Sequence, residues 1–227
     1  MGEYMKKRII LTIIICYILT IVIYHHIPPK TKYYLALGDG LARGMTLNKM
    51  EGFSYNDYIY EYFKSKGEKI EFINEYANLG ETTESLLLKL NNNYQQEETN
   101  ISLTQAISKS SLITIWIGME ELSYYNDIDT NIIEEYAKRL NKIIKFIRNY
   151  NHQKIIILGT YFYKESPIVN EEIQKIAQNH SLLYVSLDEI TNYPSIFFKP
   201  NSYELNYKGH ELIFNLIKEK LNTTCNT

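Results

Sequence analysis

The sequence contains little cysteine: two residues, Cys16 and Cys225, in a chain of 227. Cys16 lies in a hydrophobic segment and Cys225 lies in the C-terminal tail, so no disulfide framework is expected. No Cys-x-x-Cys motif and no cluster of cysteine with histidine occurs, which excludes the common structural zinc sites. We therefore predict no cofactor and no cysteine-based metal site.

The sequence also lacks an excess of basic residues. Its 24 Lys and Arg stand against 26 Asp and Glu, for a net charge of −2. The first eight residues hold Lys6, Lys7 and Arg8 against Glu3, so the rest of the chain is the more acidic part. A nucleic-acid-binding surface needs concentrated positive charge to neutralise phosphates. We therefore predict no nucleic-acid partner.

No internal repeat and no low-complexity stretch interrupts the sequence. Hydrophobic residues make up 45% and charged residues 22%, which is typical of folded proteins and excludes disorder over most of the length. The 21 tyrosines could form a surface that stacks on sugars or bases, but they are scattered, which favours a general compositional bias. About 195 residues follow the N-terminal hydrophobic segment, a length typical of one domain.

A hydrophobic segment lies near the N-terminus. Residues 9–24 contain no charged residue, and a membrane-spanning helix needs about 20 mostly apolar residues. No cleavage site with small residues follows, which favours an uncleaved anchor over a signal peptide. Three basic residues precede the segment, so the positive-inside rule places the N-terminus in the cytoplasm. We predict a single-pass cell-membrane protein with an extracytoplasmic domain: residues 1–8 cytoplasmic, 9–26 the transmembrane helix and 27–32 a linker.

Strands and helices alternate through residues 33–222, which precede a short tail at 223–227. Short apolar runs predict strands at residues 33–37, 70–76, 112–117, 155–158 and 182–187. Apolar residues at helical spacing predict helices at residues 53–64, 83–90, 131–150, 170–179 and 207–221. This alternation builds βαβ units, so we predict an α/β fold: a three-layer α/β/α sandwich with a five-stranded parallel sheet, flavodoxin-like.

Three of the predicted strands run into a glycine at their carboxyl ends: Gly38, Gly118 and Gly159. In open parallel sheets, ligands bind beyond the carboxyl ends of the strands, where the strand order reverses. We therefore expect the functional residues to follow these strands.

Four short blocks occur in order along this domain. They are Leu-Ala-Leu-Gly-Asp-Gly-Leu-Ala-Arg-Gly at 35–44, Asn-Leu-Gly-Glu-Thr-Thr at 78–83, Ile-Trp-Ile-Gly-Met-Glu-Glu-Leu at 115–122, and Asn-Ser-Tyr-Glu-Leu-Asn-Tyr-Lys-Gly-His at 201–210. In order and spacing they resemble the blocks of the SGNH/GDSL hydrolase (lipase/esterase) family. The resemblance implies the fold of that family and, as activity, the hydrolysis of acyl esters of lipids or cell-wall glycans.

The departures from the family pattern fall on the residues that the resemblance assigns to catalysis. Gly40 stands at the nucleophile position and Glu120 at the position of the oxyanion asparagine. Asn201 and Glu204 stand at the positions of the triad aspartate and histidine. Loss of the nucleophile or base from a serine triad costs on the order of 10⁶ in rate, and loss of one oxyanion donor costs roughly 10²–10³. Any one of these losses is disabling.

Other groups of the family are retained. By resemblance, Gly80 and the backbone N–H of Gly40 supply donors to the oxyanion hole, and Asp39 keeps its place before the nucleophile position. None of the remaining histidines of the domain is expected to act as the catalytic base: His152, His180 and His210.

Three hypotheses for function follow. The first, which we prefer, is a catalytically inactive pseudoenzyme at the cell envelope that binds an acyl, glycan or protein ligand in the former catalytic cleft. The second is an active ester hydrolase, of the lipase/acylhydrolase type, with non-standard residues. The third is a rebuilt carboxylate site that performs acid/base chemistry or holds a hard cation such as Ca²⁺. The residues of that third site would be Asp39, Glu120, Glu121 and Glu204.

Overall fold

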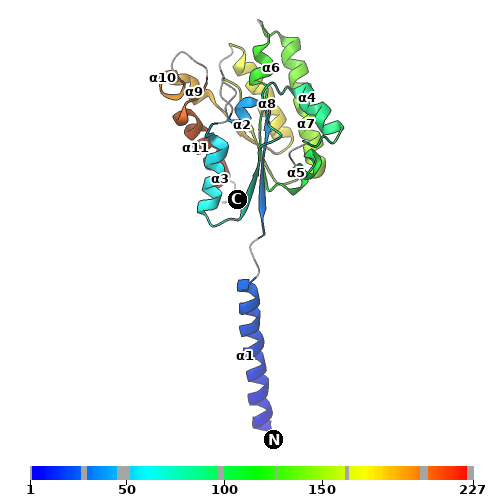
Figure 1. Ribbon diagram of the computed structural model, residues 1–227, viewed down its shortest axis with the longest axis vertical. Helices are drawn as coiled ribbons and strands as arrows, with labels where there is room; N and C mark the ends of the chain where they lie inside the picture. Colours follow the sequence, from blue (N-terminus) through cyan, green and yellow to red (C-terminus); the bar gives the residue numbers. More distant parts are fainter. Residues whose placement is uncertain are drawn as a thin grey trace. The chain divides into compact units, whose positions relative to one another are not determined.

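The computed structural model describes residues 2–26, 30–44, 52–96, 100–125, 127–161, 164–199 and 204–223. The chain divides into two compact units, Met1–Thr31 and Lys32–Thr227 (Figure 1). The first unit contains one helix, α1 (Gly2–His26), which covers the predicted segment 9–26. Within the described ranges, no helix is both long enough and apolar enough to cross a membrane.

The second unit is built on a five-stranded sheet in which every neighbouring pair is parallel. The strands are β1 (Lys32–Gly38), β2 (Ile70–Ile73), β3 (Leu112–Trp116), β4 (Lys154–Leu158) and β5 (Leu183–Val185). Their order in the sheet is β2-β1-β3-β4-β5. The predicted parallel sheet is confirmed, and its order reverses between β1 and β3, where ligands bind in sheets of this kind.

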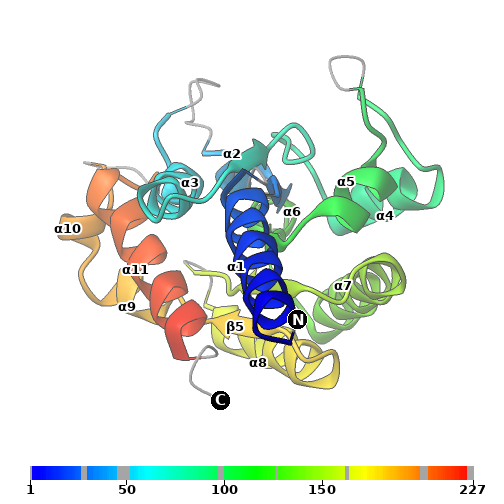
Figure 2. The ribbon, with the colours of Figure 1, turned by 90° about the horizontal axis from the view of Figure 1, so that it is seen from below.

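Helices cover both faces of the sheet, which gives the predicted three layers (Figure 2). One face carries α4 (Thr83–Asn91), α5 (Leu103–Lys109), α7 (Thr130–Tyr150) and α8 (Ser166–Asn179). The other carries α3 (Tyr55–Ser65), α9 (Asp188–Asn192), α10 (Pro194–Phe197) and α11 (Tyr207–Thr223). The remaining two helices, α2 (Gly40–Arg43) and α6 (Met119–Ser123), directly follow β1 and β3.

Successive residues of each strand supply the two cores in turn. Leu35 and Leu37 pack into the core under α4 and α7, whereas Tyr34, which directly precedes Leu35, packs into the core under α3 and α11. Side chains alternate across a strand, so a continuous apolar run is what a sheet covered on both faces requires. This is why runs of four to eight apolar residues predicted the strands correctly.

Three predicted strands are longer than the observed ones, and the one at 112–117 exceeds β3 by a single residue. The strand predicted at 70–76 ends at Ile73 because the next residues form a turn. In this turn the Ala77 N–H donates to the Asn74 carbonyl at 3.0 Å. Of the residues predicted as a strand at 182–187, only the three residues of β5 form one. In all three cases buried apolar residues continue beyond the strand, so hydrophobicity alone overestimates its length.

Candidate functional site

The candidate site lies at the carboxyl ends of β1 and β3, where the strand order reverses. Asp39 and Gly40 follow β1, and Glu120 lies in α6 directly after β3. The bend between β3 and α6 depends on Gly118, whose φ is +112°. A Cβ there would lie 2.6 Å from the ring of Tyr136, so only glycine permits this close turn.

Asp39 joins the two loops of the site. Its Oδ1 accepts the N–H of Leu41 at 3.1 Å and caps α2. Its Oδ2 accepts the N–H groups of Met119 at 3.1 Å and Glu120 at 3.3 Å, at the start of α6. Burial and then the charge of Glu120 raise the pKa of the Asp39 carboxyl to about 7, while its backbone hydrogen bonds act in the opposite direction. Asp39 therefore acts as a fully buried connector that holds α6 against the end of β1.

The Glu120 carboxylate occupies the two backbone donors that the resemblance assigned to the oxyanion hole. Its Oε1 accepts the N–H of Gly40 at 3.1 Å, and its Oε2 accepts the N–H of Gly80. Burial, with a smaller contribution from nearby Glu81, raises the pKa of Glu120, and the two amide bonds partly offset this rise. The chain thus places its own carboxylate where an ester-hydrolysing enzyme would hold the developing oxyanion.

Gly40 and Glu120 fit one another sterically. A Cβ on Gly40 would lie 2.5 Å from Glu120 Oε1 and 2.9 Å from Leu79 Cδ1. Any side chain at position 40, serine included, would therefore push the glutamate away from the amides. The two departures from the family pattern are therefore in direct contact, which the sequence did not indicate.

The loop that carries Gly80 is held close to β1. The N–H of Asn78 donates to the carbonyl of Gly38 at 3.0 Å, and the N–H of Glu81 donates to the carbonyl of Asn78 at 3.1 Å. Gly80 itself has φ of +78°, in the left-handed region that glycine adopts without strain. This turn directs the Gly80 N–H toward the Glu120 carboxylate.

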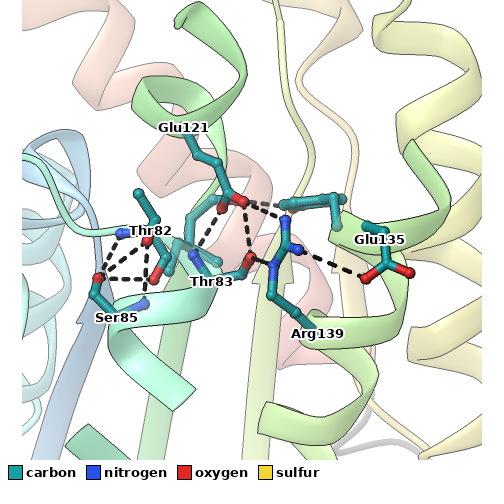
Figure 3. Close-up of polar contacts among 8 residues, drawn as sticks. Thr82, Thr83, Ser85, Glu121, Glu135 and Arg139 are labelled. Carbon is teal, nitrogen blue, oxygen red and sulfur yellow. Dashed lines mark hydrogen bonds and ion pairs between the residues drawn. The ribbon is translucent and has the colours of Figure 1, made fainter. Parts of the chain in front are cut away.

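Glu121 is buried and belongs to a separate hydrogen-bond network with side chains of α4 and α7 (Figure 3). Its carboxylate accepts the N–H of Thr83 at 2.7 Å, the hydroxyl of Thr83 at 2.9 Å and a guanidinium N–H of Arg139 at 2.8 Å. Arg139 also donates from Nε to the Thr83 hydroxyl at 2.8 Å. Glu135 lies beside the guanidinium at 3.8 Å. Glu121 therefore ties α6 to α4 and α7.

Sequence reasoning placed Glu121 in a candidate acidic site and missed this network. The available signal was Arg139, a charged residue beside the apolar stripe of α7 that includes Tyr136, Leu140 and Ile143. A charge so close to a buried stripe requires a buried partner.

The last motif block contributes little to the site in the described residues. Glu204 pairs with Lys199, 2.5 Å from its Nζ, and Asn201 lies outside the described residues. His210 stacks on Tyr55 at a ring distance of 6.5 Å, and burial lowers the pKa of this histidine to about 4. Its Nδ1 is buried without a hydrogen-bond partner. His210 is thus a neutral packed side chain.

The other two histidines lie away from the site. His152 and His180 both line a hollow at the opposite edge of the sheet. His180 is hydrogen-bonded there to Asn141, with 2.7 Å between its Nε2 and the amide oxygen.

Of the four carboxylates proposed for a rebuilt site, only Asp39 and Glu120 come together. Glu121 is committed to Arg139, and Glu204 is paired with Lys199. Within the described parts of the chain, no group of three or more His, Cys, Asp or Glu residues is arranged to hold a metal ion.

A hollow of about 410 Å³ lies at the same edge of the sheet as the site, beyond the carboxyl ends of β4 and β5. Its lining combines aromatic, hydroxyl and charged side chains, among them Thr160, Tyr161, Lys164, Asp188 and Phe198. The N–H of Tyr161 lies 3.3 Å from the sulfur of Met119, which connects this hollow to the start of α6. Its volume is in the range of small-molecule pockets.

Comparisons with known proteins agree with this architecture. The family model described as GDSL-like Lipase/Acylhydrolase matches residues 34–216. No match to a curated protein was found.

Solved structures share the fold at low sequence identity. The lipase/acylhydrolase from Enterococcus faecalis is 19% identical, with 85% of this chain and 96% of that chain covered and a TM-score of 0.62. The Clostridium thermocellum family 3 carbohydrate esterase is 16% identical, with 84% and 94% covered and a TM-score of 0.60. An extracellular lipase from Streptomyces rimosus is 13% identical, with 83% and 99% covered and a TM-score of 0.55.

The steric fit of Gly40 with Glu120 predicts a coupled pair of substitutions. We expect Gly40→Ser to lower the free energy of unfolding by about 1–3 kcal/mol, because the new side chain displaces the Glu120 carboxylate. In a Glu120→Ala background the same change should cost clearly less, since the obstructing oxygen is gone. Denaturant unfolding of the wild type, both single variants and the double variant measures this coupling. Equal costs in the two backgrounds would contradict it.

The buried Glu121–Arg139 pair predicts a large loss of stability when one partner is removed. Arg139→Gln should lower the free energy of unfolding by about 3 kcal/mol, because it leaves a buried carboxylate without its cation. Glu135→Gln is the matched control: it removes the 3.8 Å contact with Arg139 and an exposed ion pair with Lys138, and should cost under about 1 kcal/mol. Similar losses in both variants would show that the buried pair does not hold the helices.

Proposed function

Because this chain belongs to the GDSL-like lipase/acylhydrolase family, we propose that it keeps the family's scaffold as a ligand-binding module and does not hydrolyse esters. The family fold supports the presence of a site at the carboxyl edge of the sheet. The side chains at that edge support binding without turnover.

The observation that carries this proposal is the Glu120 carboxylate on the N–H groups of Gly40 and Gly80. Ester hydrolysis by a serine mechanism needs an oxygen nucleophile, and donors that stabilise the negative charge of the transition state. Residue 40 has no side chain, and both donors are already bonded to a carboxylate. A substrate oxyanion would have to displace a negative charge to reach them.

The base is missing as well. Glu204, at the position of the family's histidine, is paired with Lys199. His210 is held neutral by burial and stacks on Tyr55, so it is not presented to an incoming substrate. Residue 40 has no hydroxyl for either side chain to activate. This supports the proposal that the site does not hydrolyse esters.

The ligand is proposed to occupy the hollow at the same edge of the sheet, lined by Tyr161, Lys164 and Phe198. Aromatic faces with neighbouring hydroxyl and charged groups suit an acyl ester or a glycan, the compounds for which the similar lipases and the carbohydrate esterase are named. A protein segment is the third candidate ligand, because extended side chains of a partner can fill the same hollow.

The second part of the proposal concerns location. Residues 9–24 carry no charge and follow Lys6, Lys7 and Arg8, the pattern of an anchor with its N-terminus in the cytoplasm. The helical conformation of α1 is compatible with this pattern. We place the domain, in this proposal, on the extracytoplasmic side of the cell membrane.

An ester assay tests the loss of activity. Purified residues 31–227 should release no nitrophenol from short-chain nitrophenyl esters above the rate of a heat-inactivated sample, because the missing groups account for roughly 10⁶ in rate. The variant with Gly40→Ser, Glu120→Asn, Asn201→Asp and Glu204→His should gain measurable turnover. The same set with Gly40→Ala in place of serine is its matched control and should stay inactive. Clear turnover by the unmodified protein would overturn the proposal.

Membrane extraction tests the anchor. The full chain should sediment with membranes and stay there at alkaline carbonate, because an inserted helix is not released by loss of surface charge. Residues 31–227, expressed in the same cells, should be released by that treatment. Release of the full chain together with the shortened one would contradict anchoring.

A further inference from the structure

The edge of the sheet opposite the candidate site carries two adjoining hollows. The first, of about 500 Å³, is lined by the first residues of four strands: Lys32, Ile70, Leu112 and Lys154. The second, of about 580 Å³, lies along the starts of β4 and β5 and shares Gln153 and Lys154 with the first. Both hollows therefore open at the amino ends of the strands.

Positive charge is concentrated at this edge, although the chain as a whole is acidic. Lys32, Lys66 and Lys154 line the first hollow, and Arg148 lines the second. Among the described residues that line the two hollows, the single acid is Glu68, which lies 2.8 Å from the Lys32 ammonium.

Residues just outside the hollows continue this excess. Lys69 directly precedes β2, Lys109 ends α5 just before β3 and Lys218 lies in α11, against Glu71 in β2 and Glu219 in α11. The ammonium of Lys109 lies 5.9 Å from the ring centre of Tyr33, near the start of β1. The edge therefore attracts anions.

The basic groups differ in what they are able to bind. Arg148 donates to the backbone carbonyls of His180, Gln153 and Ser181 at 3.1, 2.9 and 2.8 Å, so it braces the loops of this edge. Lys32, Lys66 and Lys154 are exposed, although Lys32 is paired with Glu68 and Lys154 also has a contact within the chain. Flexible, exposed ammonium groups of this kind are able to exchange such partners for an external anion.

Aromatic side chains adjoin these lysines. Tyr62 and Phe63 of α3 line the first hollow, and Lys66 Nζ lies 5.5 Å from the ring centre of Tyr62. Tyr62 in turn contacts Phe214 of α11 at 5.9 Å, and Lys218 Nζ lies 5.4 Å from the Tyr62 ring. Tyrosine and phenylalanine beside lysine are typical of protein surfaces at the level of lipid head groups.

We infer that the amino edge of the sheet binds the surface of a bilayer that contains anionic lipids, with head-group phosphates held by Lys32, Lys66 and Lys154. Tyr62 and Phe63 supply the apolar contact beneath them. The relevance of this surface rests on the proposed membrane location, whereas the binding itself is argued from the positive charge and the aromatic side chains of the edge.

One consequence concerns the candidate site. Parallel strands begin at one edge of a sheet and end at the other, so Gly40, Gly80 and Glu120 lie at the edge opposite the lysines. With the amino edge on the bilayer, the site faces away from that membrane. Its ligand then comes from the space beyond the lipid surface and not from the membrane that holds the domain.

Vesicle binding tests the inference. Lys32–Thr227 is a compact unit with its own two cores, so residues 31–227 are used alone. The protein is sedimented with vesicles of phosphatidylcholine, and with vesicles in which about 30% is replaced by phosphatidylglycerol. We expect binding to the anionic vesicles only. Lys32→Gln, Lys66→Gln and Lys154→Gln together should weaken it on the order of 100-fold, at about five-fold for each lysine near the surface.

The matched control removes three exposed lysines from other faces: Lys138, Lys175 and Lys208, each changed to Gln. It alters the net charge equally and should bind like the unmodified domain. Equal weakening in both triple variants would overturn the inference, since it would reflect total charge and not this edge. Absence of binding to anionic vesicles by the unmodified domain would also overturn it.

Two further arms separate the alternatives. If inorganic phosphate at millimolar concentration abolishes vesicle binding, the lysines are assigned to a free phosphate compound and the bilayer assignment is overturned. Carbonate extraction of the full chain reports the anchor independently. If the full chain resists extraction but the shortened domain does not bind anionic vesicles, this inference is wrong and the anchor stands. If the full chain is released but the shortened domain binds those vesicles, only the anchor is wrong.

Discussion

The contact on which the site depends is the one between the Asp39 carboxylate and the first N–H groups of α6. Through Met119 and Glu120, it fixes the short helix after β3 against the end of β1. The cost of burying this carboxylate appears as a pKa raised to about 7, and three backbone hydrogen bonds offset part of it. Because α6 is held there, the next side chain along the helix, Glu120, reaches the Gly40 and Gly80 amides, and Glu121 points to Arg139.

This arrangement also explains how Glu120 and the two glycines fit together at the carboxyl edge of the sheet. The buried N–H of Gly40 would be costly without a partner, and the Glu120 carboxylate satisfies it together with the exposed N–H of Gly80. The carboxylate fits only because residue 40 has no Cβ. Glycine at the nucleophile position and glutamate at the asparagine position are therefore one structural solution. They hold the carboxyl edge of the sheet together, and they are the basis of the proposal that this edge does not hydrolyse esters.

The sequence predicted the strands and the long helices because each buries a regular stripe of side chains, as the 21-residue helix α7 does. It did not predict α2, α5 or α6, since helices of four to seven residues are too short to display a helical period. Motif order identified Gly40, Gly80 and Glu120 as neighbours. The direction of the Glu120 carboxylate, and the pairing of Glu121 with Arg139, depend on contacts between distant elements that residue spacing does not encode.

The central claim is that the Glu120 carboxylate holds the amides of Gly40 and Gly80, and amide NMR of residues 31–227 measures this directly. Charge-assisted hydrogen bonds are short and strongly perturb the donor proton. In a comparison of the unmodified domain with the Glu120→Ala variant, both glycine amide protons should move upfield and exchange faster with solvent, while amides of the distant helix α8 stay unchanged. Glycine signals that are identical in the two proteins would contradict the account.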